Sequence, residues 1–510
     1  MSPRRTRRGG QSSREAMHAQ RARPPAVDPC PPGPTGGRYR PLGEGEVRAI
    51  YDTALGILAE IGMGEAPAEL REKALSAGAE LSDRGRLCYP RAMVEDIIAG
   101  ACRSFTFHGR DPAHDIEVGG ERVYFGTGGA AVQTLDLESG DYRPSTLEDL
   151  HDFTRLADAL KNIAWFTRCC VATDVPDNFD LDINTAYTLV RGTTKPIGTS
   201  FFVADHVDPV ITLFDRVLGG EGRFRDRPFC KAHVSPVISP LRYGADAVHV
   251  ALAAMRNRMP LNNIVAAQSG ATAPAAPAGM LASTLAETLS ALVMVNVFER
   301  GYPMIFSNWP FVIDLRTGSF AGSGGEISLL NAASVQLANW LGLPSGAACS
   351  MADAKAVDAQ MGLEKALSAT AVGLAGGNML YESSGMMASL LGASFEAFVV
   401  DDEMLSLVYR LLRGIEVNDG TLNPGAIREA VFGEGHFLGG ADTMAAMERD
   451  YYYPALSDRQ DPVSWMAEGK RTILEKANER ARMILEDHHP EYIDPKTDAE
   501  LRSRFNIMIP

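Results

Sequence analysis

Short apolar runs alternate with longer helix-period segments along most of the chain. After each run, apolar residues recur every three or four positions, as in an amphipathic helix. The runs predict eight strands: Val123 to Phe125, Ala164 to Thr167, Pro196 to Phe202, Phe229 to Val234, Asn263 to Ala267, Pro303 to Phe306, Gly346 to Cys349 and Asn378 to Tyr381. Eight strands alternating with helices over roughly 260 residues are typical of a (β/α)8 TIM barrel, which is an α/β fold.

An open doubly wound sheet is the alternative architecture. The chain lacks a G-x-G-x-x-G motif followed by a suitably spaced acid, and the glycines of residues 126–129 are a weak dinucleotide signal. We therefore expect the barrel.

The segments on either side of the predicted barrel are helical. From Glu44, apolar residues at helical spacing stop at Gly62, as in a helix with a glycine just past its end. We expect a small N-terminal α/β subdomain over residues 41–118 and the barrel over residues 119–400. Residues 401–510 are expected to form a C-terminal helical extension that packs on the barrel.

Charge is distributed unevenly. Residues 1–40 contain nine Arg against two acids and carry +7, so the remaining chain must carry −22 to give the net charge of −15. The content of Arg, Ser, Pro and Gly predicts a disordered tail over residues 1–40, with a nucleic-acid or partner-binding arm as the alternative. The acidic body does not suit nucleic acid.

Composition also bears on compartment and metals. The apolar stretch from Leu281 to Phe298 is broken by Glu287 and Asn296, which favours a buried helix over a membrane span. No secretory signal is recognisable, and seven Cys at irregular spacing indicate a reducing cytoplasm. Cys230 and His233 lie three apart in a predicted strand and face opposite sides, so no metal is expected.

The densest group of charged and polar side chains follows the seventh predicted strand. Asp353, Lys355, Asp358 and Gln360 lie within a few residues of each other, and Glu382 follows the eighth strand. Barrel enzymes place their active sites where strands end, so this acid–ammonium–acid pattern predicts a site. An exposed loop that leads into a helix is an equally good reading of Asp353 to Gln360.

Aromatic and small side chains follow other predicted strands. Phe201, Trp309 and Phe311 could wall a pocket, and rings beside carboxylates suit a cationic ligand. The alternative is that these rings cap the core. Small residues at the other strand ends would let a large flat ligand or a protein partner approach closely.

Five segments, in order, resemble the trimethylamine methyltransferase family of corrinoid-dependent methyltransferases. They are GTGGAAVQTLDLESGDYRPST (126–146), QSGATAPAAPAG (268–279), SGGE (323–326), DAKAVDAQMGLEK (353–365) and GEGHFLGGADT (433–443). The resemblance covers residues 40–490. It implies a TIM barrel whose mouth receives a separate corrinoid protein, and methyl transfer from a methylated amine to Co(I).

The resemblance also implies a substrate class and roles. Archaeal trimethylamine enzymes of the family carry pyrrolysine in the loop that resembles residues 353–360, whereas this chain has standard residues there. Members without pyrrolysine that have an assigned activity act on quaternary amines such as glycine betaine. A quaternary amine leaves as a neutral amine and needs no proton, unlike a tertiary amine, so carboxylates, rings and an ordinary Lys are adequate.

Each candidate residue then has an expected role. Asp353 and Glu382 would offset the substrate charge, and Lys355 would pair with a substrate carboxylate or with a neighbouring acid. Substrate-binding residues would be Phe201, Trp309, Phe311, Asp358 and Gln360. Residues facing the corrinoid would be Gly126, Thr127, Gly128, Gln268, Ser269, Gly270 and His436. The cobalamin would be carried by the partner protein, with no cofactor bound tightly by this chain.

Two other functional classes stay open. Lys355 near a strand end could be the Schiff-base amine of a lyase. A non-catalytic binder of amines or of a corrinoid protein is the third reading. The sequence leaves a homo-oligomer open and does not identify the amine.

Overall fold

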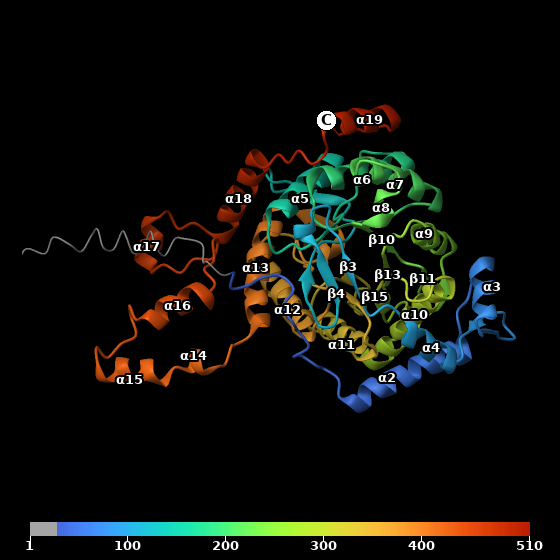
Figure 1. The fold of residues 1–510 in the computed structure, drawn as a ribbon, viewed down its shortest axis with the longest axis horizontal. Coiled ribbons are helices and arrows are strands. Elements are labelled where there is room, and N and C mark those ends of the chain that lie inside the picture. The colour runs from blue at the N-terminus through green and yellow to red at the C-terminus, as the bar shows by residue number, and fades with distance from the viewer. Residues whose placement is uncertain (1–27, 510) are drawn as a thin grey trace, which may run out of the picture. The chain divides into compact units, whose positions relative to one another are not determined.

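The computed structural model describes residues 28–509, and its centre is a parallel β-barrel (Figure 1). The strand order is β5-β19-β18-β15-β13-β10-β9-β8, with every neighbouring pair parallel. A parallel bridge between Gly126 and Trp165 joins the two outer strands of this order and closes the ring. The predicted (β/α)8 barrel is confirmed. Its strands are β5 (Tyr124–Phe125), β8 (Phe166–Thr167), β9 (Ile197–Thr199), β10 (Cys230–Val234), β13 (Leu261–Val265), β15 (Met304–Asn308), β18 (Ser345–Ala348) and β19 (Met379–Tyr381).

The eight predicted runs overlap these strands one to one. The largest difference is at β9, which ends at Thr199, three residues before the predicted end, and β13 begins at Leu261, two residues before its predicted start. The polar Asn262 made the apolar run of β13 look shorter than the strand. Inside the barrel Asn262 hydrogen-bonds His233 and accepts a hydrogen bond from Ser307, so its polar side chain is satisfied in the core.

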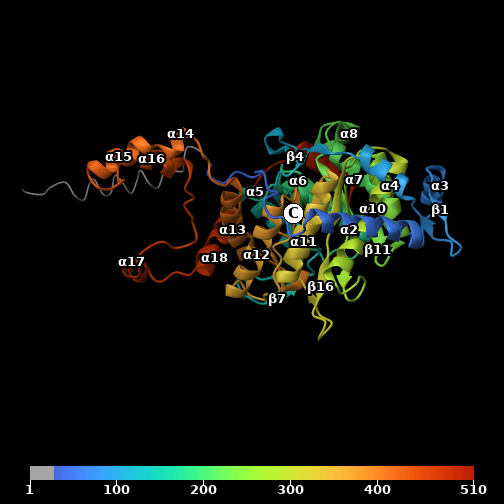
Figure 2. The ribbon, with the colours of Figure 1, turned by 90° about the horizontal axis from the view of Figure 1, so that it is seen from below.

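Helices cover the outside of the barrel between successive strands (Figures 1 and 2). They are α5 (Leu147–Ala159), α6 (Asn178–Gly192), α7 (Val207–Val217), α8 (Arg223–Asp226), α9 (Ala245–Arg256), α10 (Pro277–Phe298), α11 (Gly325–Leu341), α12 (Ala359–Ala375) and α13 (Phe395–Arg413). α10 is the one helix among the described residues with the length and hydropathy of a membrane span, and 83% of its most apolar stretch is buried. It is a core helix, as its sequence predicts.

The N-terminal region packs partly against α10. α2 (Glu44–Gly56) continues through a π-helical turn (Ile57–Ile61) and ends at Gly62, which has φ +67°. The predicted end of this helix is confirmed. The other elements are α3 (Ala68–Ser76), β1 (Glu80–Leu81), β2 (Leu87–Cys88), α4 (Arg91–Gly100), β3 (Ser104–Phe107), η2 (Pro112–His114) and β4 (Ile116–Gly119).

Short strands inserted after the barrel strands build small sheets that the sequence did not predict. Each has only two or three residues, too few for an apolar period to be recognised. They form the sheets β14-β16-β17, β20-β21-β6-β7 and β11-β12. Their bounds are β6 (Gln133–Leu135), β7 (Tyr142–Pro144), β11 (Val237–Ile238), β12 (Arg242–Tyr243), β14 (Gln268–Ser269), β16 (Phe311–Ile313), β17 (Phe320–Ala321), β20 (Met386–Met387) and β21 (Gly392–Ser394), with single turns η3 (Ala204–His206) and η4 (Ala388–Leu390).

The C-terminal region is divided. Residues 413–453 group with residues 28–31 as one compact unit, and residues 32–412 and 454–509 form the other. Within the first unit, helices α14 (Asp419–Leu422), α15 (Pro424–Phe432) and α16 (Ala441–Arg449) bury none of their residues. In the second unit, α17 (Pro462–Ala467) is followed by α18 (Ile473–Asp487), which packs on α5, and α19 (Pro495–Arg504), which packs on α7. Of the predicted tail, residues 1–27 lie outside the described residues.

Candidate active site

The loop from Asp353 to Gln360 is held by hydrogen bonds within the loop and to neighbouring loops. The Asp353 carboxylate accepts hydrogen bonds from the Gly322 backbone N–H at 2.7 Å and from the Ser389 hydroxyl at 2.6 Å. Lys355 is exposed and donates to the Asp353 carbonyl at 2.6 Å. The structure thus gives Asp353 and Lys355 partners that organise the loop.

The next two candidates stabilise the start of α12. Asp358 is the N-cap residue and accepts a hydrogen bond from the Met361 N–H at 3.1 Å. The Gln360 amide donates to Glu364 at 2.8 Å, and Glu364 accepts the backbone N–H of Asp353. A carboxylate at a helix N-cap satisfies a backbone donor that would otherwise lack a partner.

Glu382, directly after β19, is in a different environment. Its side chain is 2% exposed, and Oε2 has no hydrogen-bond partner among the described residues. Burial raises its pKa to about 8, with Lys365 and Lys231 acting in the opposite direction. A β-carbon added at Gly128 or Gly129 would lie 2.9 or 2.7 Å from a Glu382 carboxylate oxygen. The glycines after β5 therefore make room for this carboxylate.

Lys231, the second residue of β10, was not predicted from the sequence as a site residue. It is fully buried, and its ammonium donates to the Thr167 hydroxyl at 2.5 Å. It lies over the rings of Trp165 and Tyr381, with Nζ 4.6 and 4.8 Å from the ring centroids. Burial lowers its pKa to about 7, whereas the charge of Glu382 raises it. A Cβ at Gly198 would approach Nζ to 2.5 Å, so the space for Lys231 depends on that glycine.

A signal for Lys231 was present in the strand sequence. Residues 231 and 233 share a face of β10 because side chains alternate along a strand. A lysine on the inward face of a buried barrel strand is unusual, since buried lysines are rare unless they are paired or functional.

Aromatic rings gather around these two charged groups. Trp309 lies 5.0 Å from the Tyr381 ring centroid and 5.7 Å from that of His233, and Tyr381 is 4.5 Å from Trp165. Phe311 touches this group at its edge, 6.4 Å from Trp309. Burial holds the pKa of His233 well below its usual range, so its imidazole is neutral.

Several polar atoms in this part of the barrel have no partner among the described residues. They include both amide atoms of Asn308, the Trp309 indole nitrogen and the Ser384 hydroxyl. Buried polar groups without partners are rare in folded proteins and call for an explanation such as a ligand.

Backbone strain is concentrated in the loops after β18 and β19. Ser350 and Glu382 have φ of +58° and +64°, and Ala388, Ser389 and Leu390 all lie at positive φ. The Asp353 carboxylate accepts a hydrogen bond from the Ser389 hydroxyl and so holds one of these strained residues in place. Beneath the loops, Lys365 of α12 pairs with Asp401 of α13 at 2.8 Å, and both are 1% exposed. Strain of this kind persists only when the surroundings enforce it, and it clusters at functional sites.

The residues expected to face a corrinoid are in several environments. Gly126 and Thr127 are buried in the barrel, and Thr127 donates to the Thr167 carbonyl at 2.6 Å. In β14, Gln268 is partly exposed and Ser269 is buried, and Gly270 directly after the strand is exposed.

Two further candidates come from other parts of the chain. Phe201 follows β9 and is 9% exposed. His436 is exposed in the unit of residues 413–453, with its Nε2 3.6 Å from Glu434. Among residues 28–509, no three His, Cys, Asp or Glu side chains gather as a metal site.

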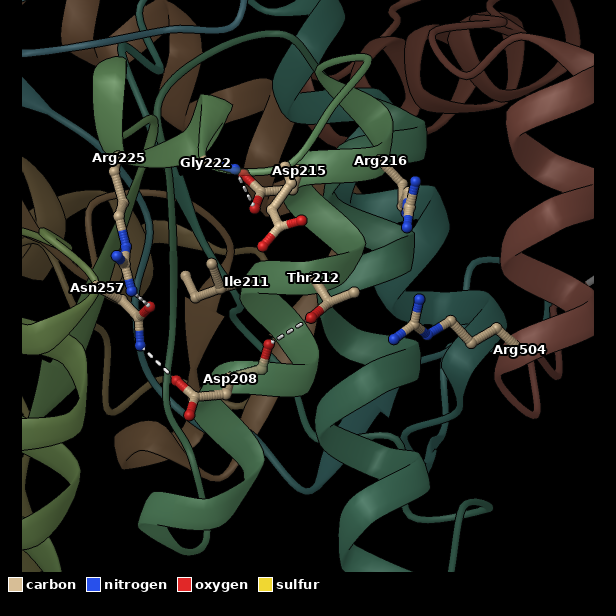
Figure 3. A pocket seen from close by; sticks show the side chains of 10 residues that line it. Asp208, Ile211, Thr212, Asp215, Arg216, Gly222, Arg225, Asn257 and Arg504 are labelled. Carbon is tan, nitrogen blue, oxygen red and sulfur yellow. Dashed lines mark hydrogen bonds between the residues drawn. The ribbon is translucent and has the colours of Figure 1, made fainter.

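A separate pocket of about 400 Å³ lies on the outside of the barrel, along α7 (Figure 3). Asn257 donates to Asp208 at 2.6 Å and accepts from Arg225 at 2.9 Å, and Asp215 accepts the Gly222 N–H. These lining groups satisfy one another, unlike the polar atoms inside the barrel.

Comparison with known proteins identifies relatives of this chain. Residues 6–506 match the family model described as trimethylamine methyltransferase (MTTB). The trimethylamine methyltransferase MttB of Desulfitobacterium hafniense strain DCB-2 is 29% identical, over 90% of this chain and 92% of the relative. The glycine betaine methyltransferase of strain Y51 is 27% identical, over 91% and 96%. The monomethylamine methyltransferase MtmB of Methanosarcina barkeri aligns with a TM-score of 0.49 and 14% identity, over 89% of each chain.

Proposed function

Because this chain belongs to the trimethylamine methyltransferase family, we propose that it removes a methyl group from a positively charged amine, with a quaternary amine of the glycine betaine type preferred. The two kinds of relative are similarly close in sequence, at 29% and 27% identity, so identity does not choose between their substrates. The observation that carries the proposal is Glu382, a buried carboxylate with an unpartnered oxygen beside a group of aromatic rings.

A cationic ligand would supply what Glu382 lacks. Removing a carboxylate from water is costly unless an opposite charge or several hydrogen bonds compensate. A quaternary ammonium cannot donate a hydrogen bond, so it is held by a nearby negative charge and by ring faces. Glu382 and the rings of Trp309 and Tyr381 are groups of these two kinds.

The protonation of Glu382 bears on the choice between amines. With a pKa raised to about 8, the free site holds a proton on this carboxyl at neutral pH. A quaternary ammonium would displace that proton and leave as a neutral amine after losing its methyl group. A tertiary amine needs a proton on nitrogen before it can leave, and a protonated Glu382 could supply it.

The methyl acceptor is part of the proposal. A corrinoid carried by a separate protein would supply a nucleophilic Co(I) when bound. Gln268 and Gly270 are accessible at the end of their strand and fit an edge that such a partner would meet, whereas the buried Thr127 does not. This chain's own residues would hold and orient the amine and exclude water around it.

The test uses the purified full-length chain with a reduced corrinoid as methyl acceptor. Glycine betaine, tetramethylammonium and trimethylamine would be supplied separately, and the demethylated amine measured by mass spectrometry. We expect products from the quaternary amines, and trimethylamine to be the poorest substrate. Turnover of trimethylamine alone would overturn the preference, and no product from any amine would overturn the proposed reaction.

A Schiff-base lyase is the second candidate, and the structure changes the residue that would carry it. Lys231 is buried with a pKa lowered to about 7, so a large fraction of its amine is neutral and nucleophilic. Lys355 is exposed and hydrogen-bonded to its own loop. Borohydride reduction with a panel of aldehydes and keto acids, followed by peptide mapping, would label Lys231 if this candidate is correct.

A further inference from the structure

Arg168 lies at the same edge of the barrel as Glu382, and its guanidinium has no partner. Arg168 directly follows β8, as Glu382 directly follows β19, and its backbone N–H donates to the Gly198 carbonyl at 3.3 Å. The strands of the barrel are parallel, so the residues that follow them lie on one side. The Arg168 side chain is partly buried, and among residues 28–509 no hydrogen bond or ion pair reaches its guanidinium.

Other arginines that are buried to a similar degree have acceptors for their guanidinium groups. Arg227 donates to the Asp115 carboxylate at 2.5 Å. Arg110 donates to the Thr193 carbonyl at 2.8 Å. A guanidinium has five N–H donors, and removing it from water costs free energy unless those donors find acceptors. An acceptor that arrives with a ligand would supply what Arg168 lacks.

The acid whose charge acts on Arg168 is Asp182 of α6, and this acid has other partners. The Asp182 carboxylate accepts hydrogen bonds from His206 at 2.7 Å and from the Phe202 N–H at 3.0 Å. Burial lowers the pKa of Arg168, and the charge of Asp182 acts in the opposite direction. Because the pKa is lowered, the attraction of Asp182 does not offset the burial of the guanidinium.

Two neighbours connect Arg168 with the group of rings around Glu382. Burial lowers the pKa of His233, and the charge of Arg168 lowers it further. The His233 ring is 5.7 Å from that of Trp309, which belongs to the group of rings. Burial raises the pKa of Cys169, the next residue along the chain, and the charge of Glu382 adds to this rise. A positive group and a negative group therefore act on the same neighbourhood at the end of the barrel.

We propose that Arg168 binds the carboxylate of a substrate whose quaternary ammonium is held by Glu382. This rests on the proposed function and narrows its substrate class to quaternary amines that carry a carboxylate. A planar guanidinium and a carboxylate form two parallel N–H···O hydrogen bonds, which an uncharged tail cannot reproduce. A zwitterion satisfies both charged groups of the site. A simple cation leaves Arg168 without a partner and is repelled by it.

The sequence pattern gave this role to a different residue. Lys355 was expected to pair with a substrate carboxylate or with a neighbouring acid, but it is exposed and donates to the Asp353 carbonyl at 2.6 Å. Water already solvates an exposed ammonium, so pairing it with a carboxylate adds little. Arg168 is partly removed from water and has free donors, and it is therefore the better partner for a carboxylate.

The test compares two ligands that share one cationic head. Glycine betaine carries a carboxylate, and choline carries a hydroxyl group instead. Isothermal titration calorimetry on the full-length chain, without a corrinoid, measures the Kd of each. We expect glycine betaine to bind more tightly, and Arg168→Gln to weaken its binding by about 100-fold, as for the loss of one partner from a buried charge pair. The same variant should leave choline binding unchanged or strengthen it by up to about threefold, because a repelling charge is removed.

Two further variants control for shape and folding. Arg168→Lys keeps the charge but loses the planar fork, so its Kd for glycine betaine should lie within about tenfold of the wild-type value. Arg225→Gln, at the separate pocket on the outside of the barrel (Figure 3), is the matched control and should change neither Kd. The melting temperature identifies a variant that fails to fold, and Arg168→Lys carries the comparison if Arg168→Gln does so.

Two results would overturn the proposal. One is equal affinity of the wild-type chain for glycine betaine and choline. The other is an equal loss of affinity for both ligands in Arg168→Gln, which would assign Arg168 a structural role.

Failure of the proposed function gives a different result. If no amine yields product, or if Glu382→Gln leaves both Kd values unchanged, the proposed reaction or its cation site is wrong. Binding of glycine betaine that still depends on Arg168 would then leave the carboxylate site standing.

Discussion

The loop of residues 353–360 and the group around Glu382 are both rich in charge, yet they are used differently. In the loop, Asp353, Lys355 and Asp358 each have a partner in the backbone or a neighbouring side chain. Inside the barrel, Glu382 is 2% exposed and keeps an unpartnered oxygen. Charge density along the sequence therefore marked a hydrogen-bonded loop, whereas burial without a partner makes Glu382 the stronger candidate for a ligand-binding residue.

The difference is one of solvation. Water can solvate an exposed charge about as well as the chain does, so the hydrogen bonds and ion pairs of that charge add little to stability. Water cannot solvate a buried charge, and leaving such a charge unpaired costs several kcal/mol, so burial favours the neutral form and raises the pKa of Glu382 to about 8. Such a cost is sustained where function requires it, which makes Glu382 and Lys231 the sharper candidates.

The largest expected effect comes from the ion pair that joins α12 to α13. Lys365→Met leaves Asp401 charged and buried, so we expect a loss of about 3–5 kcal/mol in the free energy of unfolding. Urea denaturation followed by circular dichroism measures it. The double variant Lys365→Met with Asp401→Leu should recover most of the loss, because it removes both charges. Equal destabilisation of single and double variants would contradict this account.

Next in size is the loss of the Glu382 charge. Glu382→Gln keeps the shape of the side chain but removes its attraction for a cation, and we expect kcat/KM for a quaternary amine to fall about 100- to 1,000-fold, or about 3–4 kcal/mol. Asp358→Asn and Lys355→Ala are the matched controls from the loop. If kcat/KM of a loop variant falls as far as that of Glu382→Gln, the site lies in the loop instead.

The pH dependence of cation binding should be smaller and still diagnostic. Glu382 (pKa about 8) must lose a proton to attract a cation, and Lys231 (pKa about 7) repels one less when neutral. Both effects have the same sign, so the Kd for tetramethylammonium should fall as pH rises, by about tenfold per unit below about 7, and level off above about 8. Isothermal titration calorimetry from pH 6 to 9 measures it. Glu382→Gln should weaken the dependence, and a Kd that rises with pH would exclude Glu382 as the partner.

Rising pH should strengthen cation binding by Glu382 but weaken the contribution of the same carboxyl to stability. The folded pKa of Glu382 lies above the ordinary value of 4.5, so between pH 4.5 and about 8 the native state keeps a proton that the unfolded chain has lost. Its contribution to the free energy of unfolding therefore falls as pH rises through that window. Comparing wild type with Glu382→Gln by denaturant titration isolates this contribution, and parallel pH profiles would contradict it.

The smallest effects belong to the loop. Asp358→Ala removes an N-cap and should cost about 1 kcal/mol of stability, whereas Lys355→Ala should change it by less than about 0.5 kcal/mol. Thermal unfolding resolves the first, and kcat/KM for the quaternary amine should stay within about twofold for both. A large loss of activity in Lys355→Ala would show that Lys355 takes part in the reaction.

Much of the fold could be inferred from the chain because its signals are local. Apolar runs and helical periods identified all eight barrel strands, and Gly62 marked the end of α2. The inserted strands such as β6 and β20 were missed since two or three residues carry no period. The division at residues 413–453 was missed as well, because a boundary between compact units depends on contacts between distant segments, which a helical period does not reveal.

For the candidate site, Glu382 and Trp309 were recognised from their positions at strand ends, whereas Lys231 was not. Which residue is left without a partner depends on neighbours far apart in sequence: Gly128 and Gly198 provide room for Glu382 and Lys231, and Trp165 supplies a ring. The order of residues was enough to define a ring of strands, because backbone geometry and apolar spacing act over short distances. Pairing, burial and proton affinity arise only when distant segments meet, and these properties separate a loop whose polar groups have partners from a buried carboxyl that has none.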